Sequence, residues 1–566
     1  MQARARRTGL ENDLNNRLDD RLHDHLNTEV LVIGAGGAGM YAALEAARLG
    51  AKVILADRSL IGRGGATIMA QMTVAVALGE QEPDHWEHHY ADTLAAGRGL
   101  CDPELARLLC EEGPEVIREM DAWGVGWARQ EDDPKGRIKQ AFAPGHDRPR
   151  CVYVDFLNTG PAVSRTLRTR LIRTPEIKRI GDLLVTELIV RDGECAGAVA
   201  LNMVTGQPVT IAAAATIVAT GGLTRLYQRN SASANMSGDG YALCRAAGAE
   251  LVDMEFVQFF PIGHLAPRLI GMDPIMWDPF RYKLGGRLLN GAHEEFVQNY
   301  GASDDGKYVV TRDLATYAIV KEVQAGRGSP HGGAWLSFEH CGEAALRAAA
   351  GPVLDRLAKN GIDLTRQAVE VAPIAHYHMG GVKADPSMST RVPGLLVAGE
   401  AVGGANGANR LSGNAITEAL VFGRKAGQSA AAYVLKGRAP EAEDAFKAAR
   451  ARLLGGSAVR KANPALMIES LQALMQKEVG PFRTGEGLTG ALVAMRSMQR
   501  DLPGMKPPAG KPYDTELIDW LDLSTMLEVG RCVAESALSR TESRGAHQRE
   551  DYPGLDPAWQ RNQVIA

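Results

Sequence analysis

Apolar runs and glycine-rich turns alternate near the start of the chain, and the pattern predicts parallel strands joined by a helix. Residues 29–33 (EVLVI) form an apolar strand, residues 34–39 (GAGGAG) form a glycine turn, and a helical pattern follows to Arg48. A second strand, residues 53–56, ends at Asp57. A strand, a glycine turn, a helix, a second strand and an acid about 20 residues after the turn form the dinucleotide-binding arrangement.

The residues of this unit have separate physical tasks. Gly34 and Gly36 permit the tight turn and the close approach of a pyrophosphate, while Gly39 lets the helix pack against the strand. Asp57 is expected to accept hydrogen bonds from ribose hydroxyls.

Strand signals return in residues 183–219. Polar and apolar residues alternate there around Asp192-Gly193 and Thr205-Gly206 turns, and the last strand runs into Thr220 and Gly221. An apolar strand that ends in Thr-Gly-Gly is typical of FAD domains. From about residue 240 to residue 350, clusters of proline, aromatic and charged residues break the pattern, and residues 439–537 show helical periodicity.

These patterns predict an α/β fold with a Rossmann-like FAD-binding domain, an inserted α+β capping domain and a C-terminal helical domain. The predicted boundaries are a polar N-terminal extension over residues 1–27, the FAD-binding domain over 28–240 and 356–435, the capping domain over 241–355, the helical domain over 436–545, and a tail over 546–566.

The segment from residue 376 to residue 427 gathers a histidine, an acid and an arginine among many glycines. Glu400 follows the apolar run 395–398, so it lies where a buried strand ends. Arg410 lies in a loop rich in glycine and asparagine, and Asn414 begins a helix whose positive end points back at that loop. Such a segment suits a flavin and an anionic substrate together.

Composition narrows the class of protein. The 566 residues carry a net charge of −4, so neither nucleic acid nor an anionic membrane is a predicted partner. No apolar run approaches the roughly 20 residues that cross a bilayer, and the N-terminus has no apolar signal region, so we expect a cytoplasmic protein. The seven cysteines form no C-x-x-C pair, which argues against disulfides, a metal site or an iron–sulfur cluster held by this chain.

The chain resembles the flavoprotein subunits of succinate dehydrogenase and fumarate reductase, together with their relative L-aspartate oxidase. The resemblance covers most of residues 28–560. The motifs that carry it are residues 34–39, 220–222, 237–240, 255–259, 285–290, 311–313, 376–381, Glu400, 409–411 and 539–553.

The resemblance implies FAD as the cofactor and a set of residues that bind it. Those residues are Gly34, Gly36, Gly39, Asp57, Arg58, Gly65, Thr67, Gln71, Thr220, Gly221, Asp239, Glu400, Asn414, Ala415 and Ile416.

The resemblance also implies roles in chemistry and substrate binding. Arg410 and His376 match the pair that holds a substrate carboxylate, and Arg312 matches the arginine that transfers a proton. A guanidinium rarely gives up its proton, so an acid must refill it. Asp278 and Arg281 have the spacing of such a relay, although a surface ion pair is an equally good interpretation.

Two positions depart from the resemblance. Ala66 stands where covalent relatives attach FAD through a histidine, so we expect non-covalent FAD. Phe260 stands where a histidine helps to hold a second carboxylate, and an apolar side chain does not compensate the desolvation of a buried carboxylate. His264 is the nearest alternative donor. The substrate is therefore either a dicarboxylate held differently or a monocarboxylate.

The leading hypothesis is a FAD oxidoreductase that transfers hydride between flavin N5 and a carboxylate substrate, with fumarate and succinate as the default pair. Electrons are expected to pass to an iron–sulfur partner subunit. The hypothesis allows either a homo-oligomer or a hetero-oligomer, and a partner could hold the protein at the cytoplasmic face of a membrane. The alternatives are amine oxidation like that of L-aspartate oxidase, with dioxygen or fumarate as acceptor, and a non-catalytic flavin-binding electron-transfer subunit.

Overall fold

The structure is a computed structural model that describes residues 24–155, 157–270, 275–277, 281, 284–300, 312–437, 440–456 and 463–566. Most of the predicted N-terminal extension and the candidate residue Asp278 lie outside the described residues.

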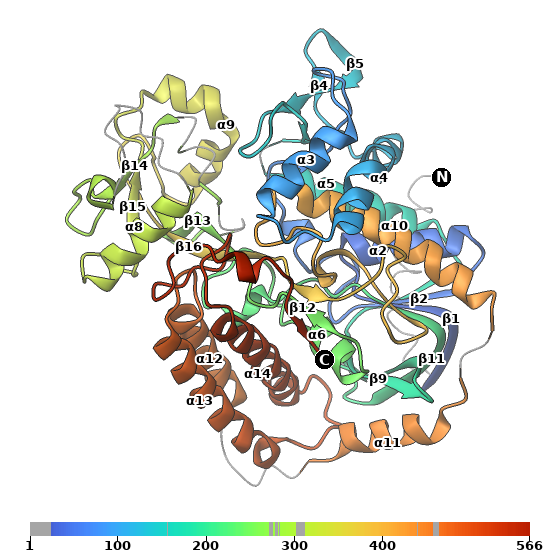
Figure 1. Cartoon of the computed structure of the whole chain (residues 1–566). Coiled ribbons are helices and arrows are strands. Elements are labelled where there is room, and N and C mark those ends of the chain that lie inside the picture. The colour runs from blue at the N-terminus through green and yellow to red at the C-terminus, as the bar shows by residue number, and fades with distance from the viewer. Residues whose placement is uncertain are drawn as a thin grey trace.

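A seven-stranded sheet forms the core of the FAD-binding domain, on the right in Figure 1. Its strands, in spatial order, are β8 (Ile177–Ile180), β2 (Val53–Ala56), β1 (His25–Ile33), β11 (Pro208–Val218), β10 (Glu194–Asn202) and β9 (Leu183–Arg191), with β18 (Leu395–Val397) also paired to β11. The strands β8, β2, β1, β11 and β18 are parallel, whereas β9 and β10 extend the sheet in antiparallel fashion. Parallel strands bring their carboxyl ends to one edge, where ligands bind in this class of sheet.

Helices α2 (Gly37–Arg48) and α10 (Asn414–Val434) run side by side against the sheet (Figure 1). Two glycines of α10 make this contact possible. A Cβ atom on Gly423 would lie 2.4 Å from the Ala38 carbonyl oxygen, and one on Gly427 would lie 2.5 Å from the Ala42 carbonyl oxygen. The backbones therefore meet directly, and the third turn of α10 is held beside the first turn of α2.

The capping domain has its own sheet and its own apolar core (Figure 1). Its antiparallel strands, in order, are β13 (Val257–Ala266), β16 (Val369–His378), β15 (Ala334–Ser337) and β14 (Arg287–Leu289), flanked by α8 (Arg312–Gln324) and α9 (Glu343–Lys359). Strand β16 belongs to the sequence segment predicted for the FAD-binding domain, yet it pairs with β13 and β15 of this sheet.

The predicted helical domain is present and contains α12 (Pro464–Glu478), α13 (Gly485–Asp501) and α14 (Thr515–Ser539). Each begins at a polar N-cap whose side chain accepts a backbone N–H, namely Asn463, Thr484 and Asp514. Helix α11 (Glu443–Leu454) packs instead on strands β9, β10 and β11. The tail returns to the body through β19 (Val564–Ile565), which pairs with β12 (Leu251–Val252) beside β17 (Gly381–Val382).

The remaining elements complete the FAD-binding domain and the connections. They are β3 (Val74–Ala75), α3 (Trp86–Ala96), α4 (Pro103–Ala122), β4 (Arg129–Gln130), β5 (Asp133–Ile138), β6 (Gln140–Ala141), β7 (Cys151–Val152), α5 (Thr159–Ile172), α6 (Asp239–Ala246), and the 3₁₀ turns η1 (Thr67–Met69), η2 (Thr224–Leu226), η3 (Val297–Tyr300), η4 (Gly399–Ala401), η5 (Leu502–Met505) and η6 (Pro557–Trp559).

A cluster of four charged residues ties α14 to the FAD-binding domain. Arg58, which follows β2, pairs with Asp239 at 3.0 Å and with Asp522 of α14 at 2.8 Å. Arg225 pairs with the same Asp522. The Asp522 side chain is only 3% exposed, so both arginines depend on a buried carboxylate.

We expect Asp522→Ala to destabilise the protein strongly, because it leaves two guanidinium groups without this partner. Removal of one member of a buried ion pair costs about 3 kcal/mol. The urea midpoint followed by circular dichroism measures the change. Glu343→Ala, which breaks an exposed pair with Arg347, is the matched control and should shift the midpoint little. Equal midpoints for the two variants would contradict the prediction.

Candidate functional site

A cavity of about 540 Å³ lies where the carboxyl ends of the parallel strands meet the capping sheet. The residues that follow those strand ends line it, and they are Gly34 after β1, Asp57 after β2, Thr220 after β11 and Glu400 after β18. Strands β13 and β16 close the other end with Phe260 and His376. The volume falls within the range of roughly 300–1,000 Å³ that small-molecule sites occupy.

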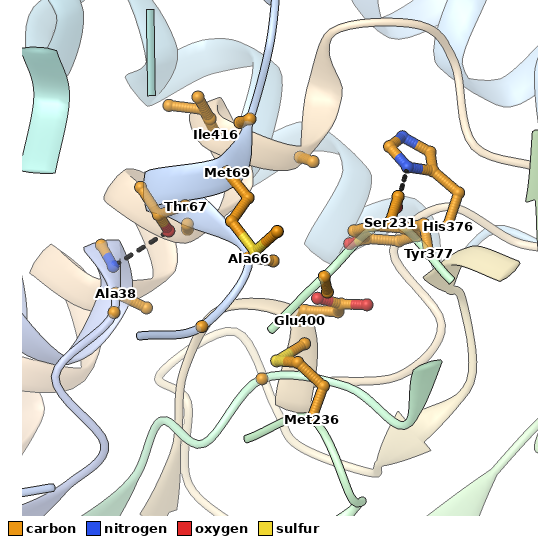
Figure 2. Close-up of a pocket in the computed structure, with 18 of the residues that line it drawn as sticks. Ala38, Ala66, Thr67, Met69, Ser231, Met236, His376, Tyr377, Glu400 and Ile416 are labelled. Atoms are coloured by element: carbon orange, nitrogen blue, oxygen red, sulfur yellow. Dashed lines mark hydrogen bonds between the residues drawn. The ribbon is translucent and has the colours of Figure 1, made fainter. Parts of the chain in front are cut away.

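Figure 2 shows the order of residues across this cavity. Ala38 and Thr67 lie at one end, Ala66 and Met69 in the middle, and His376 with Ser231 at the other end.

The glycine turn presents backbone N–H groups at the first end. Gly36 caps α2 without a side-chain hydrogen bond, and a Cβ on Gly36 would meet only Thr67 Oγ1, at 3.9 Å. Gly34 has φ +101°, and a Cβ there would lie 2.4 Å from the Ala219 carbonyl oxygen. Gly39 lies behind the turn, where a Cβ would collide with the Gly34 carbonyl oxygen. The positive end of α2 is thus open to an anion.

The predicted ribose ligand Asp57 lines the cavity and is held by local donors. Its carboxylate accepts the Ala35 N–H at 2.5 Å and both the N–H and the hydroxyl of Ser59 at 2.7 Å. Burial raises the pKa of Asp57, and these hydrogen bonds oppose the rise. Arg58 and Asp239, also in the lining, are engaged with each other in the cluster that includes Asp522.

The middle of the cavity is lined by the segment around η1, with Gly65, Ala66, Thr67 and Gln71. The Gly65 N–H donates to Ser233 Oγ at 2.8 Å, and Thr67 Oγ1 accepts the Gly37 N–H at 3.0 Å. A Cβ on Gly65 would meet nothing within 4 Å.

Opposite this segment, Glu400 is half-buried just beyond the end of β18. Its Oε1 accepts the His378 N–H at 3.1 Å, and burial raises the pKa of Glu400 to about 8. Ala415 and Ile416 line the cavity from the first turn of α10. Asn414 does not line it. Its side chain instead joins His89, Thr93 and Asn406 in a buried hydrogen-bond network behind the loop.

His376 and Arg410 both line the cavity, and Arg410 contacts Tyr377, the residue next to His376 on β16. His376 Nδ1 and Ser231 Oγ are 2.7 Å apart (Figure 2), and the Arg410 side chain is nearly buried above the ring of Tyr377. Gln258 Nε2 donates to the Arg410 carbonyl oxygen at 3.1 Å and to Asn409 Oδ1 at 2.9 Å, which fixes the loop.

The other predicted substrate residues have different surroundings. Phe260 lies edge-on to His376, with 5.6 Å between the ring centroids, and contacts Met276 and Ile374 in a small apolar cluster. His264 is not in the lining. Its Nε2 lies 2.6 Å from the Pro267 carbonyl oxygen, and its Nδ1 accepts the Trp277 indole N–H at 3.2 Å.

The proposed relay is described only in part. Arg281 is 1% exposed, so it is not a surface residue, and it does not belong to the lining of the cavity. Arg312 begins α8, and its side chain lies outside the described residues, as does Asp278.

Several lining residues were absent from the predicted set, notably Ser231, Gln258 and Tyr377. Gln258 and Tyr377 lie inside motifs that carried the family resemblance, so their position beside His376 and Phe260 was a usable signal. Ser231 had no comparable signal, because its contact with His376 depends on the fold.

Comparisons with known proteins agree with this geometry. A family model described as FAD binding domain matches residues 29–416, and one described as fumarate reductase flavoprotein C-term matches residues 468–565. The fumarate reductase (CoM/CoB) of Methanothermobacter marburgensis has a chain that is 33% identical over 95% of this chain and 96% of its own length. The fumarate reductase flavoprotein subunit of Escherichia coli is 32% identical over 92% of this chain and 88% of its own.

Among solved structures, the apo Sdh1 complex of Mycobacterium smegmatis aligns with a TM-score of 0.85 and 32% identity, covering 95% of this chain and 91% of that chain. The protein is therefore a FAD-dependent oxidoreductase. The chain belongs to the family of fumarate reductase and succinate dehydrogenase flavoprotein subunits.

The residues of the cavity fit FAD. The first turn of α2, where among the described residues only the Gly37 N–H is engaged by a side chain, suits a pyrophosphate, and the open space at Gly65 leaves room for a ligand.

Two further findings concern the described residues. None of their helices is both long and apolar enough to cross a bilayer. They also contain no group of three or more His, Cys, Asp or Glu residues that could hold a metal ion.

The raised pKa of Glu400 predicts a pH-dependent stability. Because the folded chain holds this proton more tightly than the unfolded chain, the contribution is full below pH 4.5 and is lost as the pH rises to about 8. Each pH unit in that window costs up to about 1.4 kcal/mol. We expect Glu400→Gln to flatten the fall of the melting temperature across the window, measured in excess FAD. Glu343→Gln, at an exposed site, is the control, and a Glu400→Gln profile parallel to the parent's would refute the assignment.

Proposed function

We propose that the protein interconverts an α,β-unsaturated carboxylate and its saturated form, with fumarate and succinate as the first pair to test. One observation carries the proposal. His376, from the capping sheet, and Arg410, from the loop before α10, both line a cavity whose other end has the features of a FAD site, and Arg410 contacts Tyr377, the neighbour of His376. The sequence similarity to fumarate reductase flavoprotein subunits supports the same reaction class.

In this proposal Arg410 and His376 bind one substrate carboxylate. A guanidinium can hold a carboxylate with two parallel hydrogen bonds, and burial strengthens that attraction. Ser231 fixes the orientation of the His376 ring. FAD, when bound, supplies the hydride donor or acceptor. The chain's contribution is to hold the reacting carbons in one orientation and to polarise them through the carboxylate.

Proton transfer is assigned to Arg312, with Asp278 and Arg281 as the relay that restores its proton. The support is the Thr-Arg-Asp motif and the position of α8, which begins at Arg312 and packs against the strands that carry Phe260 and His376. An acid in the relay is needed because a guanidinium alone holds its proton too tightly.

The electron partner in this proposal is a separate iron–sulfur subunit. The seven cysteines of the chain are scattered and without a C-x-x-C pair, and several relatives are named as subunits of larger enzymes. The subunit would accept or deliver the electrons that the substrate exchanges with FAD.

FAD should be bound without a covalent link, because the methyl group of Ala66 offers no nucleophile at the position where covalent relatives attach it. Acid precipitation of the pure protein should leave all of the yellow flavin in the supernatant, as measured by absorbance. Flavin that stays with the pellet after washing would show a covalent bond.

The reaction is tested by reoxidation of the reduced flavin with a panel of carboxylates. Fumarate carries two carboxylates, whereas crotonate and acrylate carry one each. L-aspartate, offered to the oxidised protein, tests amine oxidation. We expect at least one unsaturated carboxylate to reoxidise the flavin.

Arg312→Ala should reduce turnover by at least about 10²-fold, the usual effect of losing a proton-transfer group, with FAD content unchanged. Arg347→Ala, on the exposed face of α9, is the control. Normal turnover by Arg312→Ala would remove that residue from the mechanism.

A further inference from the structure

A buried polar cluster lies directly beneath Arg410. Glu418, from the second turn of α10, accepts the hydroxyl of Tyr377 at 2.5 Å and the side-chain amide of Asn406 at 2.6 Å, both on Oε2. All three side chains are less than 5% exposed. The cluster therefore joins strand β16, the loop before Arg410 and helix α10.

Tyr377 connects this cluster to Arg410. The guanidinium carbon of Arg410 lies 4.6 Å from the centre of the Tyr377 ring, which is a cation–π contact. This contact does not consume an N–H donor, and Arg410 Nη1 donates to the Leu411 carbonyl oxygen at 3.2 Å. A phenol that donates to a carboxylate becomes richer in electrons, and the face of its ring attracts a cation more strongly.

The backbone of Arg410 is held from the same pair of strands. Gln258 of β13 lies opposite Tyr377 of β16 in the sheet register, and its side chain donates to the Arg410 carbonyl oxygen. Strands β13 and β16 thus hold Arg410 at two points, through its main chain and through its side chain.

The buried position of the Glu418 carboxylate carries a desolvation cost. Its Oε1 is buried without a hydrogen-bond partner in the described part of the chain, and burial raises the pKa of Glu418 to about 7. The positive charge of Arg410 acts against that rise, as do the hydrogen bonds from Tyr377 and Asn406. Glu400 is a second, half-buried acid of the same region, and the charge of Glu418 contributes to its raised pKa. A residue that served packing alone would not need this charge.

We infer that Glu418 is a positioning residue for Arg410: it fixes the Tyr377 ring and enriches its face, so that the guanidinium is held ready to bind a carboxylate. The inference rests on the proposed role of Arg410 as the carboxylate ligand. Glu418 itself touches neither the substrate nor FAD in this arrangement, and it does not line the cavity.

The test uses Tyr377→Phe, Glu418→Gln and the double variant in the complete protein with bound FAD. Each single variant should lower kcat/KM for the best carboxylate of the panel by about tenfold, the size expected for a desolvated cation–π contact. The double variant should be no worse than Tyr377→Phe, because Glu418 acts through the Tyr377 hydroxyl. A purely local structural role would instead give effects that multiply.

Two controls make the result specific. Tyr433→Phe removes a hydrogen bond of the same type, to Glu194 at 2.6 Å, from the other end of α10, and should leave kcat/KM unchanged. In an Arg410→Lys background, Tyr377→Phe should have little further effect, since the planar cation that the ring supports is gone. FAD content and melting temperature are recorded for every variant. If Glu418→Gln does not fold, Tyr377→Phe in the two backgrounds still decides the question.

Binding measurements separate this inference from the proposed reaction. Malonate and butyrate are titrated calorimetrically into the parent and each variant, and Tyr377→Phe and Glu418→Gln should each raise Kd by about tenfold. If the parent binds these anions but turns over no carboxylate, the proposed reaction fails while the positioning role is still measured. Unchanged Kd and kcat/KM in both single variants overturn the inference, as does a parent that binds neither anion.

Discussion

The direct backbone contact between α2 and α10 is the constraint on which the site depends. Gly423 and Gly427 let α10 lie against Ala38, within the glycine turn, and against Ala42, one helical turn further on. Because both helices begin at the cavity, this contact places the loop that carries Arg410 over the end of the sheet. A side chain at either glycine would separate the helices by the width of a methyl group and would move the two ends of the cavity apart.

Ion pairs at the domain boundaries also hold the domains together. Arg58 and Arg225 share Asp522 of α14, and Arg540, just after α14, pairs with Glu255 immediately before β13. These groups are buried or nearly so, so each pair is sensitive to the loss of its partner. The helical domain thus supports the FAD-binding domain and the first strand of the capping sheet from one side of the molecule (Figure 1).

The sequence was sufficient for elements whose signals are local. The boundaries of β2 and the end of α2 at Arg48 were predicted because apolar spacing marks them locally, whereas α2 begins at Gly37, inside the predicted glycine turn. Strand β1 begins earlier than predicted, at His25, because its first residues are polar and pair with Thr210 rather than form an apolar run. The helical domain was visible from its periodicity, and the family resemblance supplied its place in the fold.

Contacts between distant segments could not be read in the same way. The pairing of Arg58 with Asp522, of Ser231 with His376 and of Tyr377 with Glu418 follows from how the domains meet. Residue types favoured an anion site in the segment 376–427, and the family resemblance then assigned His376 and Arg410 to it. They gave no sign that His264 would be engaged with Pro267 and Trp277.

The two residues of the proposed carboxylate site come from different domains. His376 belongs to the sheet of the capping domain, whereas Arg410 belongs to the loop that precedes a helix of the FAD-binding domain. A carboxylate held by both residues would act as a bridge between the two domains. Ligand affinity and the orientation of the capping domain are then linked quantities, so a change that turns the cap by a small angle alters binding without touching the ligand.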